Sequence, residues 1–310
     1  MIRYYAKHSL NEDFQLLKTP RQDNVWLFAN DVDLEELEDL SSQYQFDHNI
    51  TRDVLDRDEL PRIEYKNDAL YVFLRTATRN KRGEVITTPL LGVVRPTVFA
   101  TLMPGSALDP ESIMQSELTL GSGETTVLLL NTFARVVADY EKLIHRTAHY
   151  IKDTGHRLRT HDVNNRDFIR FVTIEDNLNE YRMNLDGMLA VANRLQENKH
   201  DLFTANDVEA IEDIMLYLKQ LLVAVDSHSQ SITSIRNAYS TIANNTLNQR
   251  MKMLTMLTVL IALPNVFYGM YGMNIPLPFQ EEPWAYPAII GFTSILLATI
   301  ALIAFRKRFF

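Results

Sequence analysis

Two long apolar runs near the C-terminal end of the chain constrain the fold more than any other feature. Residues 253–271 are apolar apart from Thr255, Thr258 and Asn265, and residues 288–305 form a second run. Each run approaches the roughly 20 residues that a helix needs to cross about 30 Å of hydrocarbon. One such run could be a buried core helix, but two runs joined by a short loop predict a transmembrane hairpin.

The charges that flank the two runs predict their orientation. Arg250 and Lys252 precede the first run, and a basic cluster at 306–308 follows the second. The loop between them has no Lys or Arg and carries two acids, Glu281 and Glu282. Because positive charge is retained on the cytoplasmic side, we expect both termini in the cytoplasm and the loop outside. No apolar signal segment opens the chain, so we predict a multi-pass protein of the cytoplasmic (inner) membrane.

Composition narrows the classes of function. The chain has 310 residues, a formal charge of -8 and no cysteine, which excludes disulfides and thiolate metal sites. An acidic chain without a basic stripe argues against a nucleic-acid partner. The Gly-rich segment 121–123 lacks the Lys-Ser/Thr of a phosphate-binding loop, and no nucleophile–base arrangement stands out. We therefore expect neither an enzyme nor a resident cofactor.

The first part of the chain predicts a cytoplasmic α/β domain over residues 1–160. The segment 80–83 reads as a hairpin turn, with Gly83 free to take a positive φ, and 33–44 reads as an amphipathic helix. Mixed helices and strands indicate an α/β or α+β domain. The expected strands are Ile2–Tyr5, Val25–Phe28, Arg62–Tyr65, Leu70–Leu74, Val85–Thr88, Leu91–Val94 and Val98–Leu102.

The second part of the chain reads as helical. Helices are expected over 124–161 and 165–198, and a third from Asp207, because no Gly or Pro occurs between there and Leu263. Asn206 or Asp207 can cap its start. A helix of about 60 residues would be about 90 Å long, which suits a stalk that enters a membrane. The predicted divisions are 1–160, 161–252 with the stalk at about 207–252, and the hairpin 253–310.

A stripe of polar and small residues follows the stalk helix into the first apolar run. It collects the polar residues of the run and two glycines, whereas the other faces are Leu, Ile, Val, Met and Phe. Polar groups in hydrocarbon must face protein or water, so the stripe is either a helix–helix contact face or a pore wall shared by several copies around an axis. It consists of Asn248, Met251, Thr255, Thr258, Ala262, Asn265, Gly269 and Gly272.

The end of the first apolar run resembles a known family. Tyr271-Gly272-Met273-Asn274 follows a long apolar helix that contains Pro264, and this looks like the signature of the CorA family of divalent-cation channels. The segment 248–255 resembles that family's entry to the pore helix. In the soluble part, 60–65 followed by 70–75 is also similar to the family. The likeness covers essentially the whole chain in order and layout.

The resemblance implies a homopentamer with a funnel-shaped cytoplasmic domain, whose first span lines a pore for Mg²⁺, and also Co²⁺ and Ni²⁺. It maps the outer selectivity ring to Asn274, in a turn held by Gly272 and Met273. Mg²⁺ dehydrates reluctantly, and amide oxygens can accept hydrogen bonds from its retained waters. The resemblance further implies pore-lining and gate positions at Asn248, Met251, Leu254 and Asn265, the last standing where many members have threonine.

The resemblance also implies regulation by cytoplasmic cation sites between neighbouring subunits. Glu212 and Asp213 occupy a matching region of the stalk, where bound intracellular Mg²⁺ would favour the closed state. An ordinary charged helix face explains these two acids equally well. The outer acids Glu281 and Glu282 could raise the local cation concentration, or could simply be a solvated loop.

Two other functions stay open at this point. One branch of the same superfamily moves Zn²⁺, and the sequence does not settle the ion. A different class of protein, a sensor or enzyme that is only tethered by its hairpin, would also contain two spans. The polar stripe argues against a mere tether, because an anchor has no use for polar groups in hydrocarbon.

Overall fold

The computed structural model describes residues 1–6, 14–105, 108–114, 124–160, 165–273, 278–279 and 281–306. The chain forms two compact units, Met1–Ile235 and Arg236–Phe310. One helix, α6 (Ala205–Tyr271), continues from the first unit into the second. The predicted combination of a mixed α/β domain, a long helix and a C-terminal apolar helix is confirmed.

The first unit contains a mixed seven-stranded sheet with the order β2-β1-β3-β7-β6-β5-β4. Only the β3–β7 pair is parallel among the described strands, and its register sets Leu27 beside Ala100. All other neighbours are antiparallel. The strands are β1 (Ile2–Ala6), β2 (Gln15–Leu16), β3 (Val25–Ala29), β4 (Arg62–Lys66), β5 (Ala69–Arg79), β6 (Val85–Val94) and β7 (Val98–Leu102).

Helices cover both faces of this sheet, because both faces are apolar. On one face Leu27 and Phe73 pack with the buried side chains of α1 (Leu34–Tyr44) and α2 (His48–Arg52). Successive strand residues point to opposite faces, so Trp26 and Gly92 lie on the other face. There a Cβ added to Gly92 would come within 3.0 Å of Leu129 of α4 (Glu124–Thr160).

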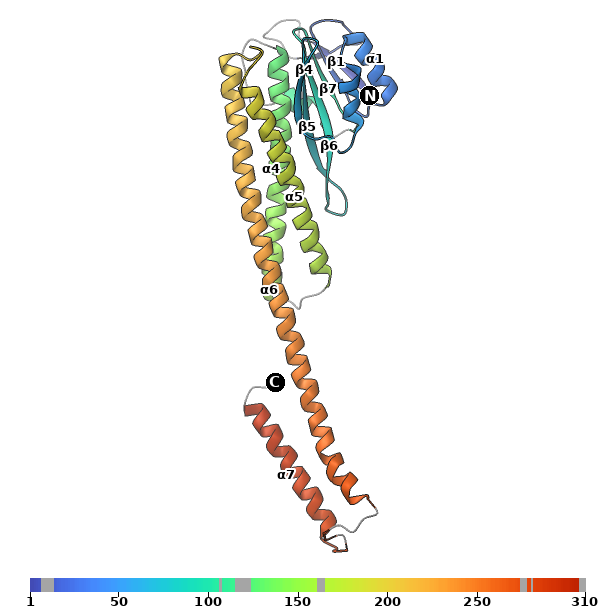
Figure 1. Cartoon of the computed structure of the whole chain (residues 1–310), viewed down its shortest axis with the longest axis vertical. Coiled ribbons are helices and arrows are strands. Elements are labelled where there is room, and N and C mark those ends of the chain that lie inside the picture. The colour runs from blue at the N-terminus through green and yellow to red at the C-terminus, as the bar shows by residue number, and fades with distance from the viewer. Residues whose placement is uncertain are drawn as a thin grey trace. The chain divides into compact units, whose positions relative to one another are not determined.

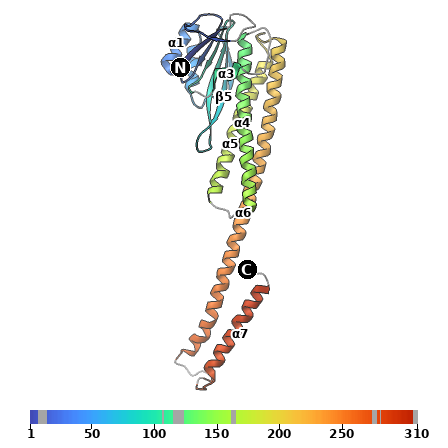
Figure 2. The same cartoon turned by 180° about the vertical axis from the view of Figure 1, so that it is seen from behind.

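Three helices pack together beside the sheet in the first unit. In Figures 1 and 2, α4, α5 (Asn165–Gln196) and the first part of α6 lie side by side. Their buried faces are filled by large side chains such as Tyr140, Tyr181 and Leu218. Three short elements lie between the longer ones in the chain of this unit: α2, η1 (Asp53–Leu55) and α3 (Pro110–Met114).

Two local details differ from the sequence predictions. Strand β6 continues through Pro89, where two separate runs were expected. Proline is tolerated there because β7 pairs with β6 only from Leu91 to Val94, so the missing N–H at Pro89 faces no strand on that side.

The start of α6 is capped by Thr204 rather than Asn206 or Asp207. Its hydroxyl accepts from the Asp207 amide at 3.3 Å, and the Asp207 carboxylate accepts from the Thr204 amide at 2.9 Å.

The hairpin turn is confirmed. Gly83 has a φ of 88°, and its amide donates to the Asn80 carbonyl at 3.1 Å. The Asn80 side-chain oxygen accepts from the amides of Arg82 and Glu84 at 2.9 and 3.0 Å. The turn between β5 and β6 is therefore a hydrogen-bonded structure with a defined backbone.

A buried arginine ties the sheet to the preceding loop. Arg75 of β5 is only 6% exposed. It donates to the carbonyls of Arg57 and Glu59 at 2.9 and 2.7 Å, and to the Thr87 hydroxyl at 2.7 Å. Thr87 in turn donates to a Glu180 carboxylate oxygen of α5 at 2.7 Å. A charged group at this depth is tolerated because nearly all of its donors have partners.

We predict that Arg75→Met lowers the free energy of unfolding by about 2–4 kcal/mol, because it leaves the two loop carbonyls and Thr87 without their buried donor. Thermal unfolding of the full-length protein in detergent measures this, with fluorescence of the buried Trp26 as the probe. The matched control, Arg52→Met on the exposed end of α2, should change the melting temperature little. Equal effects of both substitutions would contradict the structural role of Arg75.

Candidate functional site

The two apolar helices pack through one face of α6. The half-exposed residues of α6 in this region recur at helical spacing, and Phe267 lies edge-on to Phe292 of α7 (Ala285–Arg306) with ring centroids 5.4 Å apart. Tyr268 and Thr293 hydroxyls are 3.3 Å apart. Of the described helices, α6 and α7 are long and apolar enough to cross a membrane. The half-exposed residues are Met256, Leu260, Leu263, Pro264, Phe267 and Tyr271.

The polar stripe lies on a different face of α6. Every one of its eight residues, from Asn248 to Gly272, is exposed in the single chain. The hairpin contact with α7 therefore does not cover it. Leu254, which the resemblance added to the pore positions, is 61% exposed, and Met251 is 57% exposed.

The polar side chains of the stripe differ in how they are satisfied. The Thr258 hydroxyl donates to the Leu254 carbonyl at 2.9 Å, one turn earlier in the same helix. Its oxygen can still accept a hydrogen bond from outside the helix. Within the part of the chain that the structure describes, the Asn265 amide has no hydrogen-bond donor or acceptor as a partner. An unpartnered amide in a helix of this apolarity needs water or a neighbouring chain.

Contacts within one chain do not explain why the stripe has glycine at positions 269 and 272. A Cβ at Gly269 would meet nothing within 4 Å, and one at Gly272 would meet backbone oxygens only at ordinary contact distances of 3.4–3.5 Å. The helix ends here: the Gly272 amide donates to Tyr268 and Gly269 carbonyls, and the Met273 amide to the Met270 carbonyl at 3.2 Å. Asn274, the third residue of the tripeptide, lies outside the described residues.

The two acids of the interhelical segment lie just before α7. Glu281 and Glu282 are exposed, and the Glu282 carbonyl accepts from the Ala285 amide at 3.0 Å. The rings of Phe279 and Trp284, which flank these acids in the sequence, are tilted by 47° with their centroids 5.1 Å apart. The backbone of this turn is thus organised, while both carboxylates are accessible to solvent.

The two acids of the stalk region, Glu212 and Asp213, are exposed on the first part of α6. Glu212 accepts from the Gln196 amide at 2.8 Å. Tyr217 follows Asp213 by one helical turn on α6. Burial and the nearby Glu141 carboxylate raise the pKa of Tyr217 to about 12, so its hydroxyl stays neutral. Among the described residues, no group of three His, Cys, Asp or Glu side chains is arranged to hold a metal ion. Within one chain, the two acids therefore lack the further ligands that a cation site requires.

Comparison with known proteins decides the family. The family model described as "CorA-like Mg2+ transporter protein" matches residues 21–308. The chain belongs to this family.

Relatives of the family match over most of the chain. The cobalt/magnesium transport protein CorA of Methanocaldococcus jannaschii is 22% identical over 291 residues, which cover 91% of this chain and 90% of the relative. The protein of the same name from Thermotoga maritima is 21% identical over 270 residues, covering 84% and 75%. The complete structure of the CorA magnesium transporter from M. jannaschii superposes with a TM-score of 0.84 at 18% identity, over 99% of this chain and 98% of that one. The fold of this chain is therefore that of a full-length CorA protein.

The structure adds exposed apolar residues that the sequence analysis did not single out. Leu216 and Val223 of α6 are 57% and 69% exposed, and they are seven residues apart on one face of the helix. Sequence periodicity alone did not reveal them, because the opposite face of the same helix is also apolar. Leu218 and Val225 on that face are fully buried within the first unit.

Proposed function

We propose that this protein is a channel of the CorA family that carries Mg²⁺, and also Co²⁺ and Ni²⁺, across the cytoplasmic membrane as a homopentamer. The observation that carries the proposal is the uncovered stripe of α6. All eight residues of the stripe are exposed in one chain, and the hydrogen bond of the Thr258 hydroxyl goes to the Leu254 carbonyl of its own helix rather than to α7. Copies arranged around an axis would supply partners for the stripe as shared water and close helix contacts.

The membrane topology follows from charge. Arg250 and Lys252 at one end of the first span and Arg306 after the second favour cytoplasmic termini. Glu281 and Glu282 would then face the outside, where they attract cations to the pore mouth. An inside-negative potential contributes about 4.6 kcal/mol per 100 mV for a divalent ion, so inward flux needs no ATP.

The selectivity filter is assigned to the tripeptide Gly272, Met273 and Asn274. A ring of Asn274 amide oxygens would accept hydrogen bonds from the waters that Mg²⁺ retains. The steric freedom at Gly269 and Gly272 supports close approach of neighbouring copies at the same end of the helix. Below the filter, the amide of Asn265 and the hydroxyls of Thr255 and Thr258 offer further polar contacts to hydrated ions.

The gate is assigned to the apolar side chains of Met251 and Leu254. Both are more than half exposed in one chain, so a ring of copies would bring them together. An apolar constriction closes to ions by losing its water, without any occluding group. Asn248 lies one turn before Met251 and would hold water at the cytoplasmic entrance.

Feedback by intracellular Mg²⁺ is assigned to Glu212 and Asp213. One chain leaves these acids exposed and without enough ligands for a cation. A second copy would have to supply the missing carboxylate, which makes cation binding and subunit contact the same event. Mg²⁺ bound there would stabilise one arrangement of the subunits, and its loss would release that arrangement.

We predict that Asn274→Ala abolishes selective Mg²⁺ uptake into liposomes that hold the purified protein, because the ring of amide oxygens is lost. Wild-type uptake should be blocked by cobalt hexaammine, which mimics the hydrated ion. The matched control, Asn49→Ala on the exposed surface of α2, should transport as the wild type does.

Three outcomes of this flux experiment separate the candidate functions. Loss of uptake with Asn274→Ala alone supports the hydrated-ion channel. Zn²⁺ flux without Mg²⁺ flux would move the protein to the zinc branch of the superfamily. An absence of flux for any divalent ion in the wild type would favour the tethered sensor.

We predict that Val223→Asp weakens the oligomer, because it places a charge on an exposed apolar helix face that neighbouring copies would bury. Light scattering on the detergent-solubilised protein should show a smaller assembly than the wild type. Leu16→Asp, an equivalent change at an exposed residue of the edge strand β2, should leave the assembly unchanged. An intact pentamer with Val223→Asp would contradict a subunit interface on this face of α6.

A further inference from the structure

A threonine occupies the most buried position of the apolar hairpin. Thr293 of α7 is only 2% exposed, and Ala285 is the only other buried residue among the described residues of the second unit. Hydrocarbon offers no hydrogen bond, so a polar side chain in a membrane helix must find its partner in protein or water. The contact between α6 and α7 is thus built around a hydroxyl group, and the partners of that hydroxyl show what the contact does.

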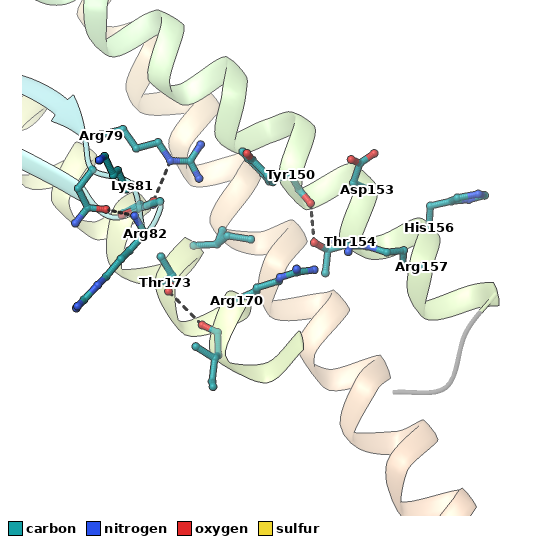
Figure 3. Close-up of a pocket in the computed structure, with 15 residues that line it drawn as sticks. Arg79, Lys81, Arg82, Tyr150, Asp153, Thr154, His156, Arg157, Arg170 and Thr173 are labelled. Carbon is teal, nitrogen blue, oxygen red and sulfur yellow. Dashed lines mark hydrogen bonds between the residues drawn. The ribbon is translucent and has the colours of Figure 1, made fainter. Parts of the chain in front are cut away.

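The first partner of this hydroxyl lies in its own helix. Thr293 donates to the Ile289 carbonyl at 2.8 Å, one turn earlier in α7. Such a bond is common for a threonine inside a helix, and Figure 3 shows it in α4, where Thr154 donates to the Tyr150 carbonyl. With its hydrogen directed at a carbonyl, the Thr293 oxygen still has a lone pair for a second donor.

Tyr268 of α6 supplies the second donor. Its hydroxyl oxygen lies 3.3 Å from that of Thr293. Because the Thr293 hydrogen is directed at the Ile289 carbonyl, Tyr268 is the donor of this hydroxyl pair. The Tyr268 side chain is 48% exposed, whereas its hydroxyl end reaches the buried threonine. A phenol in an apolar span needs a partner for its O–H group, and α7 provides one.

A ring contact at the same level of the hairpin fixes the rotation of α6. Phe267, which precedes Tyr268, contacts Phe292, which precedes Thr293, with ring centroids 5.4 Å apart and an angle of 81° between the rings. Adjacent residues of a helix project about 100° apart around its axis. Two adjacent side chains of α6 that contact two different side chains of α7 therefore set the rotation of α6 as well as its distance from α7.

The same tyrosine holds the end of α6 through its main chain. The Tyr268 carbonyl accepts from the Gly272 amide at 3.1 Å, and the Gly269 carbonyl accepts from the same amide at 3.2 Å. Such a shared bond is common where a helix ends. Gly272 is the first residue of the tripeptide to which the filter is assigned. Tyr268 is thus joined to α7 by its side chain and to the start of that tripeptide by its backbone.

We propose that Tyr268 and Thr293 are positioning residues, which hold the turn at Gly272 and Met273 and through it the selectivity filter. The hydroxyl pair fixes the rotation of the last turns of α6, and the Tyr268 carbonyl transmits this constraint to the Gly272 amide. The consequence for ions rests on the assignment of the filter to residues 272–274. A ring of amides selects a hydrated ion by the spacing of its oxygens, so a turn that can rotate admits other cations.

Hydrogen–deuterium exchange of the full-length protein in liposomes, followed by mass spectrometry, tests the positioning role without any ion flux. Tyr268→Phe keeps the ring and Thr293→Val keeps the shape of the side chain, but each removes one hydroxyl of the pair. Both variants should exchange the Gly272 and Met273 amides about fivefold faster than the wild type does, because the turn opens more often.

Two matched variants of α7 complete this test. Thr293→Ser retains the hydroxyl and should exchange at the wild-type rate. Thr299→Val removes an exposed hydroxyl of the same helix, which donates to the Ile295 carbonyl at 2.7 Å, and should also leave the exchange unchanged.

Ion selectivity provides a second readout, which a merely stabilising contact would not move. In the liposome assay, Tyr268→Phe and Thr293→Val should each lower the ratio of Mg²⁺ to Na⁺ flux about fivefold while cation uptake persists. The double variant should select no worse than Thr293→Val alone, because the two hydroxyls act as one pair.

The outcomes distinguish this inference from the channel proposal. Wild-type exchange in Tyr268→Phe and Thr293→Val, or equal acceleration in Thr299→Val, would overturn the positioning role even where Mg²⁺ flux is normal. In a wild type that carries Mg²⁺, an unchanged flux ratio in both variants, or a double variant whose loss is the product of the single losses, would overturn it as well. If the two variants exchange faster but the wild type carries no Mg²⁺, the hydroxyl pair holds the turn as inferred and the channel proposal fails.

Discussion

The exclusion of unsatisfied polar groups from hydrocarbon is the constraint on which the account of this protein depends. Helix α6 is apolar on most faces after residue 252, yet one stripe carries two threonines, an asparagine and two glycines. Packing against α7 uses the opposite residues, such as Phe267 and Tyr268, and leaves the stripe uncovered. In the oligomer that we propose, other copies and water would satisfy the polar groups of the stripe.

The first unit can support such an assembly because its core is formed within Met1–Ile235. Both faces of the sheet are covered by helices. Arg75 links β5 to the loop before β4 by donating hydrogen bonds to the carbonyls of Arg57 and Glu59. The first part of α6 buries Leu218 and Val225 in this unit while exposing Leu216 and Val223. A helix that buries one face in the first unit and exposes a second apolar face could make the subunit contacts that we propose.

Much of this architecture was predictable from sequence because the signals were local. The absence of Gly and Pro between Asp207 and Leu263 predicted α6, and Gly83 predicted the turn that its φ of 88° confirms. The continuity of β6 through Pro89 was not predictable, since it depends on where β7 ends. The contact between Arg79 and the Tyr150 ring was also not predictable, because only the tertiary fold brings these two residues together. The roles of Asn274, Met251 and Glu212 stay predictions that rest on family resemblance and chemistry.

Cysteine accessibility along α6 tests the central claim most directly, and the chain has no native cysteine to remove. Single cysteines at Thr258 and Asn265 on the stripe are compared with cysteines at Leu260 and Phe267 on the face toward α7, in protein reconstituted in liposomes. A membrane-impermeant charged thiol reagent should modify the first pair and block Mg²⁺ uptake, and should leave the second pair unmodified. Equal protection of both pairs would show that the stripe is a dry helix contact and would contradict a water-filled pore.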